Sequence, residues 1–269
     1  MLYTFGTLYF YGAAWYNNIS IIPTSEGGWK LESFNGIVIE DDQTVEQRID
    51  VRNLQVYGRG VFREDVDADE IEVFGSARFR SFVSCDQLSV PGETVMLDSL
   101  LAESVRVDGV LNVSGKFRTE VAVVEGMMNT QGKLHATRLV IRSRGRLEAA
   151  GNIKAERIVI GGVAFSGATF RGDNIEITSC EQSEIARIVA SDIKVTYKPR
   201  GDVPGIKEGE YLLSAYSIEA QTAELEYVAA DSLECDSAVI GPGCRIGELT
   251  YRDGLELDPG AVVERLNKI

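Results

Sequence analysis

The stretch "IEVFGSARFRSFVSCDQLSVPG", residues 71–92, contains one short phrase twice. It begins with Ile-x-Val-x-Gly at residues 71–75 and ends with Leu-x-Val-x-Gly at residues 88–92, so that a 17-residue step separates the two copies. Self-similarity at a fixed period is the signature of repeat architectures, in which each repeat buries its apolar face against its neighbours. The phrase therefore indicates a repeat architecture.

The pair of apolar positions in this phrase recurs ten times. The pairs are Ile37/Ile39, Leu54/Val56, Ile71/Val73, Leu88/Val90, Val105/Val107, Ala122/Val124, Leu139/Ile141, Ile158/Ile160, Ile175/Ile177 and Ile193/Val195. All but two of the steps repeat the same 17-residue spacing, and the exceptions are a 19-residue and an 18-residue step. Glycine often stands two positions after a pair, where it supplies the backbone freedom of a corner. The 19-residue step predicts a slightly enlarged turn between residues 143 and 155.

Two more columns precede each pair. Large side chains stand five positions before it and small ones three positions before it, as Val83 and Cys85 do before Leu88. Alternate residues of a strand face opposite sides, so this period of two predicts strands with one inward face. A 17-residue repeat is too short for a helix-turn-helix or βαβ unit. The sequence therefore predicts an all-β fold, a single-stranded β-helix (β-solenoid) with three short strands per turn, in which Phe62 lies over Phe79.

The repeat divides one continuous domain into three regions. Residues 1–197 are expected to form the main body of the β-helix. The segment "KPRGDVPGIKEGE" breaks the phase and contains two prolines, so residues 198–212 are predicted to form a protruding loop. The ladder resumes at Leu213 and continues at Val228 after a 15-residue step, and residues 213–269 are expected to continue the β-helix and cap it.

Composition restricts the function. The formal net charge of −14 disfavours nucleic acid as a partner. The four cysteines form no CxxC pair and the chain has one histidine, so neither a metal site nor a cofactor is expected. Reduced thiols and the absence of a basic segment before the apolar N-terminus favour a cytoplasmic protein. The N-terminal segment 1–25 carries no charged side chain, which indicates either buried first layers or, alternatively, membrane contact.

These features together resemble the bactofilins, the polymer-forming cytoskeletal proteins of bacteria. The resemblance rests on phrases such as "ADEIEVFG" (68–75), "AESVRVDG" (102–109) and "AERIVIGG" (155–162). The C-terminal segment 239–269 is similar to the ending of the longer Firmicute-type members. The resemblance implies a right-handed β-helix that assembles into filaments without nucleotide, often as a scaffold at the inner face of the membrane. The chain departs from the family pattern in its aromatic first layers, its 198–210 loop and its lack of long tails.

Candidate catalytic features are better explained by structure. His135 lies between two inward positions and is expected to point outward. "GPGCRIG" (241–247) lacks the P-loop and dinucleotide-binding patterns. The acids at one corner recur in nearly every repeat, whereas a glycosidase needs an isolated pair in a cleft. We therefore expect no enzymatic activity. Of three functions that a β-helix of this kind could have, a polysaccharide-acting enzyme is less favoured than a scaffold or a partner-binding protein.

Two outward columns are candidate contact surfaces. Arg118, His135, Lys154 and Arg171 form a mostly basic column, which is either a solvated face or a contact for an acidic partner. Val123, Val140 and Val159 form an apolar strip, which reflects either β-propensity or lateral association.

The expected function is that of a self-assembling scaffold, because a solenoid has two ends whose backbone groups lack partners. The candidate assembly ends are Leu8, Phe10 and Trp15 at one end, and Leu255 and Leu257 at the other. The alternative is a β-helix that does not polymerise and binds a protein or envelope partner through its loop and basic column.

Overall fold

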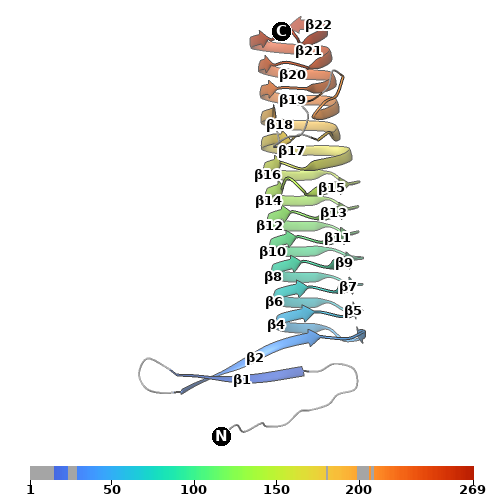
Figure 1. Ribbon diagram of the computed structural model, residues 1–269, viewed down its shortest axis with the longest axis vertical. Helices are drawn as coiled ribbons and strands as arrows, with labels where there is room; N and C mark the ends of the chain where they lie inside the picture. The colour runs from blue at the N-terminus through green and yellow to red at the C-terminus, as the bar shows by residue number, and fades with distance from the viewer. Residues whose placement is uncertain (1–14, 24–28, 180, 199–205, 207–208) are drawn as a thin grey trace.

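A computed structural model describes residues 15–23, 29–179, 181–198, 206 and 209–269. The described chain is an all-β parallel solenoid of about 13 turns with roughly 17 residues per turn (Figure 1). Its strands stack along one axis, and the C-terminal strand lies at the far end of the stack from the N-terminal hairpin (Figure 1). The solenoid that the 17-residue spacing predicts is confirmed.

The lower turns form two stacks of parallel strands. The first stack contains β2 (Trp29–Ile39), β4 (Ile49–Val56), β6 (Val66–Val73), β8 (Val83–Val90), β10 (Leu100–Val107), β12 (Phe117–Val124), β14 (Leu134–Ile141) and β16 (Ile153–Ile160). The second contains β3 (Gln43–Val45), β5 (Arg59–Phe62), β7 (Ser76–Phe79), β9 (Glu93–Met96), β11 (Val110–Val113), β13 (Met127–Thr130) and β15 (Arg146–Ala149). Each of these turns therefore holds one long and one short strand.

The long strands contain a corner in the middle. In β6 the burial pattern alternates except at Asp69 and Glu70, which are both exposed. Asp69 is left out of the pairing of β6 with β4 and β8, while its neighbours pair on both sides. Two of the three short segments expected from the sequence are thus joined in one strand, because pairing with the neighbouring turns resumes directly after the unpaired corner residue.

The upper turns merge the two stacks. Each turn from β17 on is one continuous strand: β17 (Val163–Ser179), β18 (Ser183–Tyr197), β19 (Leu213–Leu225), β20 (Val228–Ile240), β21 (Arg245–Leu257) and β22 (Val262–Lys268). β17 pairs with both β15 and β16 and so closes both stacks of the lower turns. The predicted 15-residue step is confirmed, because Leu213 pairs with Val228. The bounds of β18 and β19 leave residues 198–212 between them; most of that predicted loop lies outside the described residues.

The core is a set of inward columns in which like side chains stack. Ile71 pairs with Leu88, and the rings of Phe62 and Phe79 stack with centroids 4.7 Å apart and planes 10° apart, as predicted. Cys85 occupies the small inward column and is 5% exposed. The two extra residues of the 19-residue step fall between β14 and β15, where Gly145 donates a hydrogen bond to the carbonyl of Arg142.

The N-terminal layer differs from the prediction. β1 (Trp15–Pro23) pairs with β2 in antiparallel register, with Trp15 opposite Ile37. Strands this close in sequence can pair only in the antiparallel sense, because a parallel pair needs a connection of a dozen or more residues. A hairpin therefore replaces the expected first turn of the parallel solenoid.

Candidate assembly surfaces and partner-binding face

Within the part of the chain that the structure describes, no turn covers the core columns at their C-terminal end. Leu249 in β21 is fully buried, but Leu266, which pairs with it in β22, is 49% exposed. Likewise Ile240 is 1% exposed, and Leu257, which pairs with it one turn later, is 46% exposed. These leucines continue inward columns and are exposed because no described residue lies above them. The C-terminal end is therefore a cross-section of the apolar core.

The backbone at this end is also open. β22 pairs with β21, and within the described chain no strand pairs with its other edge. An unpaired edge presents N–H and C=O groups to which another strand can add. Leu255 and Val263 are partly buried against the core, whereas Val262 pairs with the exposed Arg245 and continues an outward column. The expected C-terminal cap is thus a short final strand with an exposed apolar side.

The N-terminal end is built differently. β1 pairs with residues 29–37 of β2, so it covers part of the edge that the first stack would otherwise present. Of the three residues predicted for this end, Trp15 begins β1, whereas Leu8 and Phe10 lie outside the described residues. The two ends of the solenoid are therefore not equivalent.

The valine strip lies where the sequence predicts it. Val123 pairs with Val140, and Val140 pairs with Val159, on consecutive turns. All three are partly buried rather than fully exposed. Arg106 precedes them in the same column and Glu176 follows them, so the apolar strip is only three layers long.

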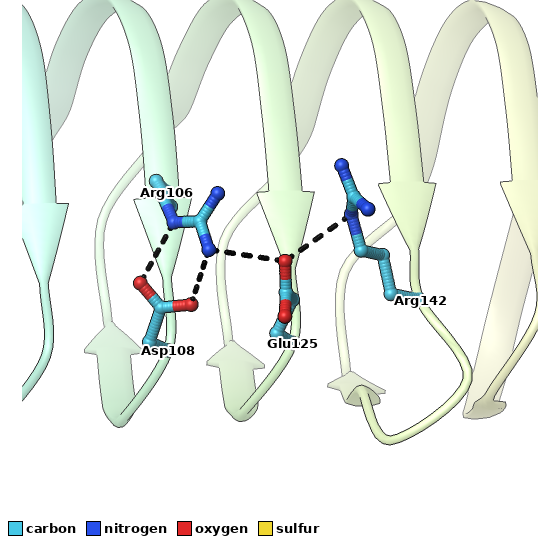
Figure 2. A network of polar contacts seen from close by, with 4 residues as sticks. All are labelled: Arg106, Asp108, Glu125 and Arg142. Atoms are coloured by element: carbon cyan, nitrogen blue, oxygen red, sulfur yellow. Dashed lines mark hydrogen bonds and ion pairs between the residues drawn. The ribbon is translucent and has the colours of Figure 1, made fainter.

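An ion-pair network borders this strip. Arg106 donates to Asp108 at 2.8 and 2.9 Å and to Glu125 at 3.1 Å, and Arg142 approaches Glu125 at 3.3 Å (Figure 2). The hydrogen bonds to Asp108 are the main cause that raises the pKa of Arg106. The network links β10, β12 and the end of β14. Exposed pairs of this kind contribute little to stability individually.

The predicted basic column is continuous. Arg118 pairs with His135, His135 with Lys154, and Lys154 with Arg171. All four side chains are exposed, as predicted for His135, and none forms an ion pair with another described residue.

Two shallow depressions run beside the basic column. One of about 590 Å³ is lined by Lys154 and Arg171 but also by Glu156 and Asp173. The other, of about 600 Å³, is lined by Arg118 together with three acids of the corner ladder, Asp86, Glu103 and Glu120. The small inward column forms part of the floor of both. This face therefore carries mixed charge and has no clear preference for an anionic partner.

A third depression was not found from the sequence. It has a volume of about 810 Å³ and extends over β13, β15 and the first halves of β17 to β20. Its lining includes Phe165, Tyr216 and three acids, Glu148, Glu184 and Asp231. We call it the β15–β20 groove.

Burial raises the pKa of the three described thiols. The pKa of Cys85 rises to about 12, through burial and the nearby Asp86, and those of Cys235 and Cys244 rise to about 11. The thiolate is the reactive form, so these thiols are expected to resist iodoacetamide at neutral pH. The protonated thiols contribute fully to stability at a pH below their ordinary pKa of 9.0. This contribution is lost as the pH rises through their pKa values in the folded protein.

Mass spectrometry of a Cys180→Ser variant tests this expectation. Cys180 lies outside the described residues, and its removal leaves only the three buried thiols. They should be alkylated at the rate at which the protein unfolds, and fully in urea. Rapid labelling of Cys85 in the folded variant would show that its burial is wrong.

The described residues contain no group of three or more potential metal ligands and no helix with the length and apolarity to span a membrane. Comparison of the chain with known proteins finds no matching family model, no similar curated protein and no similar solved structure.

Proposed function

We propose that this protein is a self-assembling structural scaffold that polymerises through the ends of its solenoid, without nucleotide. The observation that carries the proposal is the C-terminal end, where inward columns stop at half-exposed leucines such as Leu257 and Leu266. Another copy whose strands add to β22 would cover these side chains and pair the open edge at the same time. Both effects favour association, and neither requires a nucleotide.

The resemblance to bactofilins supports the same function. It implies a cytoplasmic scaffold organised at the inner face of the membrane, with other copies of the chain as its main partner and a protein or envelope component as a further one. The corner acids support a structural rather than a catalytic role, because they recur at one position of the repeat.

We further propose that the solenoid is right-handed. Successive strands in each stack are parallel neighbours joined by a crossover, and about 98% of crossover connections between parallel strands of one sheet are right-handed. The bactofilin resemblance implies the same hand. Each turn then has three faces. The long strand forms one face on each side of its corner, and the short strand forms the third.

Sedimentation velocity of purified protein tests the assembly. The wild type is expected to form large species whose size grows with protein concentration. Leu257→Asp places a charge on the open end and should shift the distribution to the monomer, because burial of an unpaired carboxylate is strongly unfavourable.

Leu101→Asp is the matched control. Leu101 is 41% exposed, close to the 46% of Leu257, but it lies on the side of the solenoid. This variant should assemble like the wild type. A monomer at every wild-type concentration would instead favour the alternative, a β-helix that binds a protein or envelope partner and does not polymerise.

A further inference from the structure

We propose that Asp253 is a site of spontaneous modification, at which the aspartyl residue isomerises to isoaspartate. Asp253 precedes Gly254, and glycine hinders attack by its own backbone nitrogen on the preceding side chain less than any other residue, because it has no Cβ. The sequence contains one other Asp-Gly pair, Asp108 and Gly109. The structure gives the two pairs opposite surroundings, and this difference selects Asp253.

The reaction needs no enzyme and no reactant other than water. The backbone nitrogen of Gly254 forms a bond to Cγ of Asp253, and its proton and the carboxyl hydroxyl leave as one molecule of water, so that a succinimide ring forms. Water then adds to one ring carbonyl and breaks the bond of that carbon to the nitrogen. Opening at the side-chain carbonyl restores aspartate, whereas opening at the main-chain carbonyl gives isoaspartate, with no net change in composition.

Asp253 lies in a β-bulge of the last full turn. Cys235 of β20 pairs with Tyr251 of β21, whereas Ser237 pairs with Gly254. Two residues of β21, Asp253 among them, therefore stand opposite one residue of β20. A bulge leaves a residue out of the ladder and disrupts the pairing locally, so the backbone here is less constrained than in the regular turns.

The other edge of this segment is open. The pairs of β22 with β21 end at Tyr251, and within the described chain no strand pairs with Asp253 or Gly254 from that side. Asp253 is exposed, and its carboxylate forms no ion pair or hydrogen bond with a described residue. A Cβ at Gly254 would meet nothing nearer than the Ser237 hydroxyl oxygen at 3.6 Å. Both the carboxyl group and the backbone therefore have room to form the ring.

The other Asp-Gly pair is held at each point where the reaction needs freedom. The carboxylate of Asp108 accepts hydrogen bonds of 2.8 and 2.9 Å from Arg106 (Figure 2). The attacking nitrogen, that of Gly109, donates to the carbonyl of Val90 at 2.8 Å. A Cβ at Gly109 would lie 2.0 Å from the carbonyl oxygen of Gly92, so the corner has no space for the ring. Reaction at Asp108 therefore requires local unfolding.

Isoaspartate would alter the open end of the solenoid. It adds one carbon atom to the main chain before Gly254, which puts the following residues out of phase with β20. Leu257, which pairs with Ile240, is one of them. Altered assembly is a consequence that rests on the proposed function, whereas the isomerisation itself does not. Assembled copies would cover this turn, so the free end is the form that reacts.

Incubation of the full chain in water labelled with heavy oxygen tests the proposal, at a protein concentration at which sedimentation velocity finds the monomer. Each succinimide that opens takes up one labelled oxygen atom, so peptide mass spectrometry measures the reaction at each aspartate. In the folded protein, Asp253 should take up label at least about 10-fold faster than Asp108. A methyltransferase specific for isoaspartate should then methylate the peptide that contains residue 253.

Gly254→Ala is the matched variant, because its methyl group would make only an ordinary van der Waals contact with Ser237. It should slow the uptake at Asp253 severalfold and leave that at Asp108 unchanged. In urea the two Asp-Gly pairs of the wild type should react at similar rates, since neither is then held by the fold. Equal uptake at both sites in the folded protein, no isoaspartate at residue 253, undiminished uptake in Gly254→Ala, or an equally large difference in urea would overturn the proposal.

Discussion

Replacing Phe79 with alanine is expected to destabilise the solenoid by about 3–5 kcal/mol, the usual cost of truncating a fully buried phenylalanine. Phe79 is completely buried, stacks on Phe62 with 4.7 Å between ring centroids, and pairs with Met96 on the next turn. The cavity cannot close easily, because the strands on either side are fixed by the hydrogen bonds of the ladder. The loss therefore includes both the buried apolar surface and the contacts with these neighbours.

Urea denaturation followed by circular dichroism measures this effect, in a Leu257→Asp background so that assembly does not contribute. Phe74→Ala is the matched control, since Phe74 is 43% exposed and stacks on Tyr57 at the surface. Phe74→Ala should lower the free energy of unfolding by about 1.5 kcal/mol or less. Because a solenoid is stabilised turn by turn, hydrogen exchange of Phe79→Ala should accelerate in β5–β9 and much less in β18–β20. Equal costs for the two variants would contradict the stacked core.

Gly109→Ala is expected to destabilise the protein by about 3 kcal/mol or more. A Cβ at this corner would lie 2.0 Å from the carbonyl oxygen of Gly92 and 2.4 Å from that of Pro91. Both obstacles are backbone atoms of the turn below, and Gly109 itself donates a hydrogen bond to Val90 there at 2.8 Å. The turns would have to separate locally to admit one methyl group.

Gly167→Ala is the control for this corner. A Cβ at Gly167 would meet nothing within 4 Å, and its backbone φ is not in the left-handed region. It should be neutral or slightly stabilising, because alanine reduces the conformational entropy of the unfolded chain. The same urea measurement compares the two variants. A Gly109→Ala protein as stable as Gly167→Ala would show that the corner glycines are not required by the spacing of the turns.

The regular turns were predictable because each inward column repeats the same physical requirement. Ile71 and Leu88 fill equivalent places, and their spacing alone predicts that they stack. The outward positions followed from the same register, so the order of Arg118, His135 and Lys154 along one column was also predictable. The sequence could not show that pairing resumes directly after the corner residue of a long strand, since this depends on backbone geometry.

The features that were missed arise where the repeat changes. Phe165 and Glu184 are register neighbours on β17 and β18 although they are 19 residues apart, so the 17-residue phase does not align them, and both line the β15–β20 groove together with Tyr216. At the N-terminus, a short connection between Pro23 and Trp29 requires an antiparallel pair, a local rule that composition does not reveal. The open C-terminal end could be recognised only in the structure, from exposed residues whose equivalents in other turns of the solenoid are buried.

Electron microscopy of the purified wild-type protein without nucleotide tests the central claim most directly. The proposed end-to-end assembly predicts unbranched filaments one solenoid wide, longer than the single rod of about 13 turns, which spans roughly 60 Å. Leu257→Asp should abolish these filaments, and Leu101→Asp should preserve them. Single rods at every concentration, or filaments that persist in Leu257→Asp, would contradict assembly through the open C-terminal end.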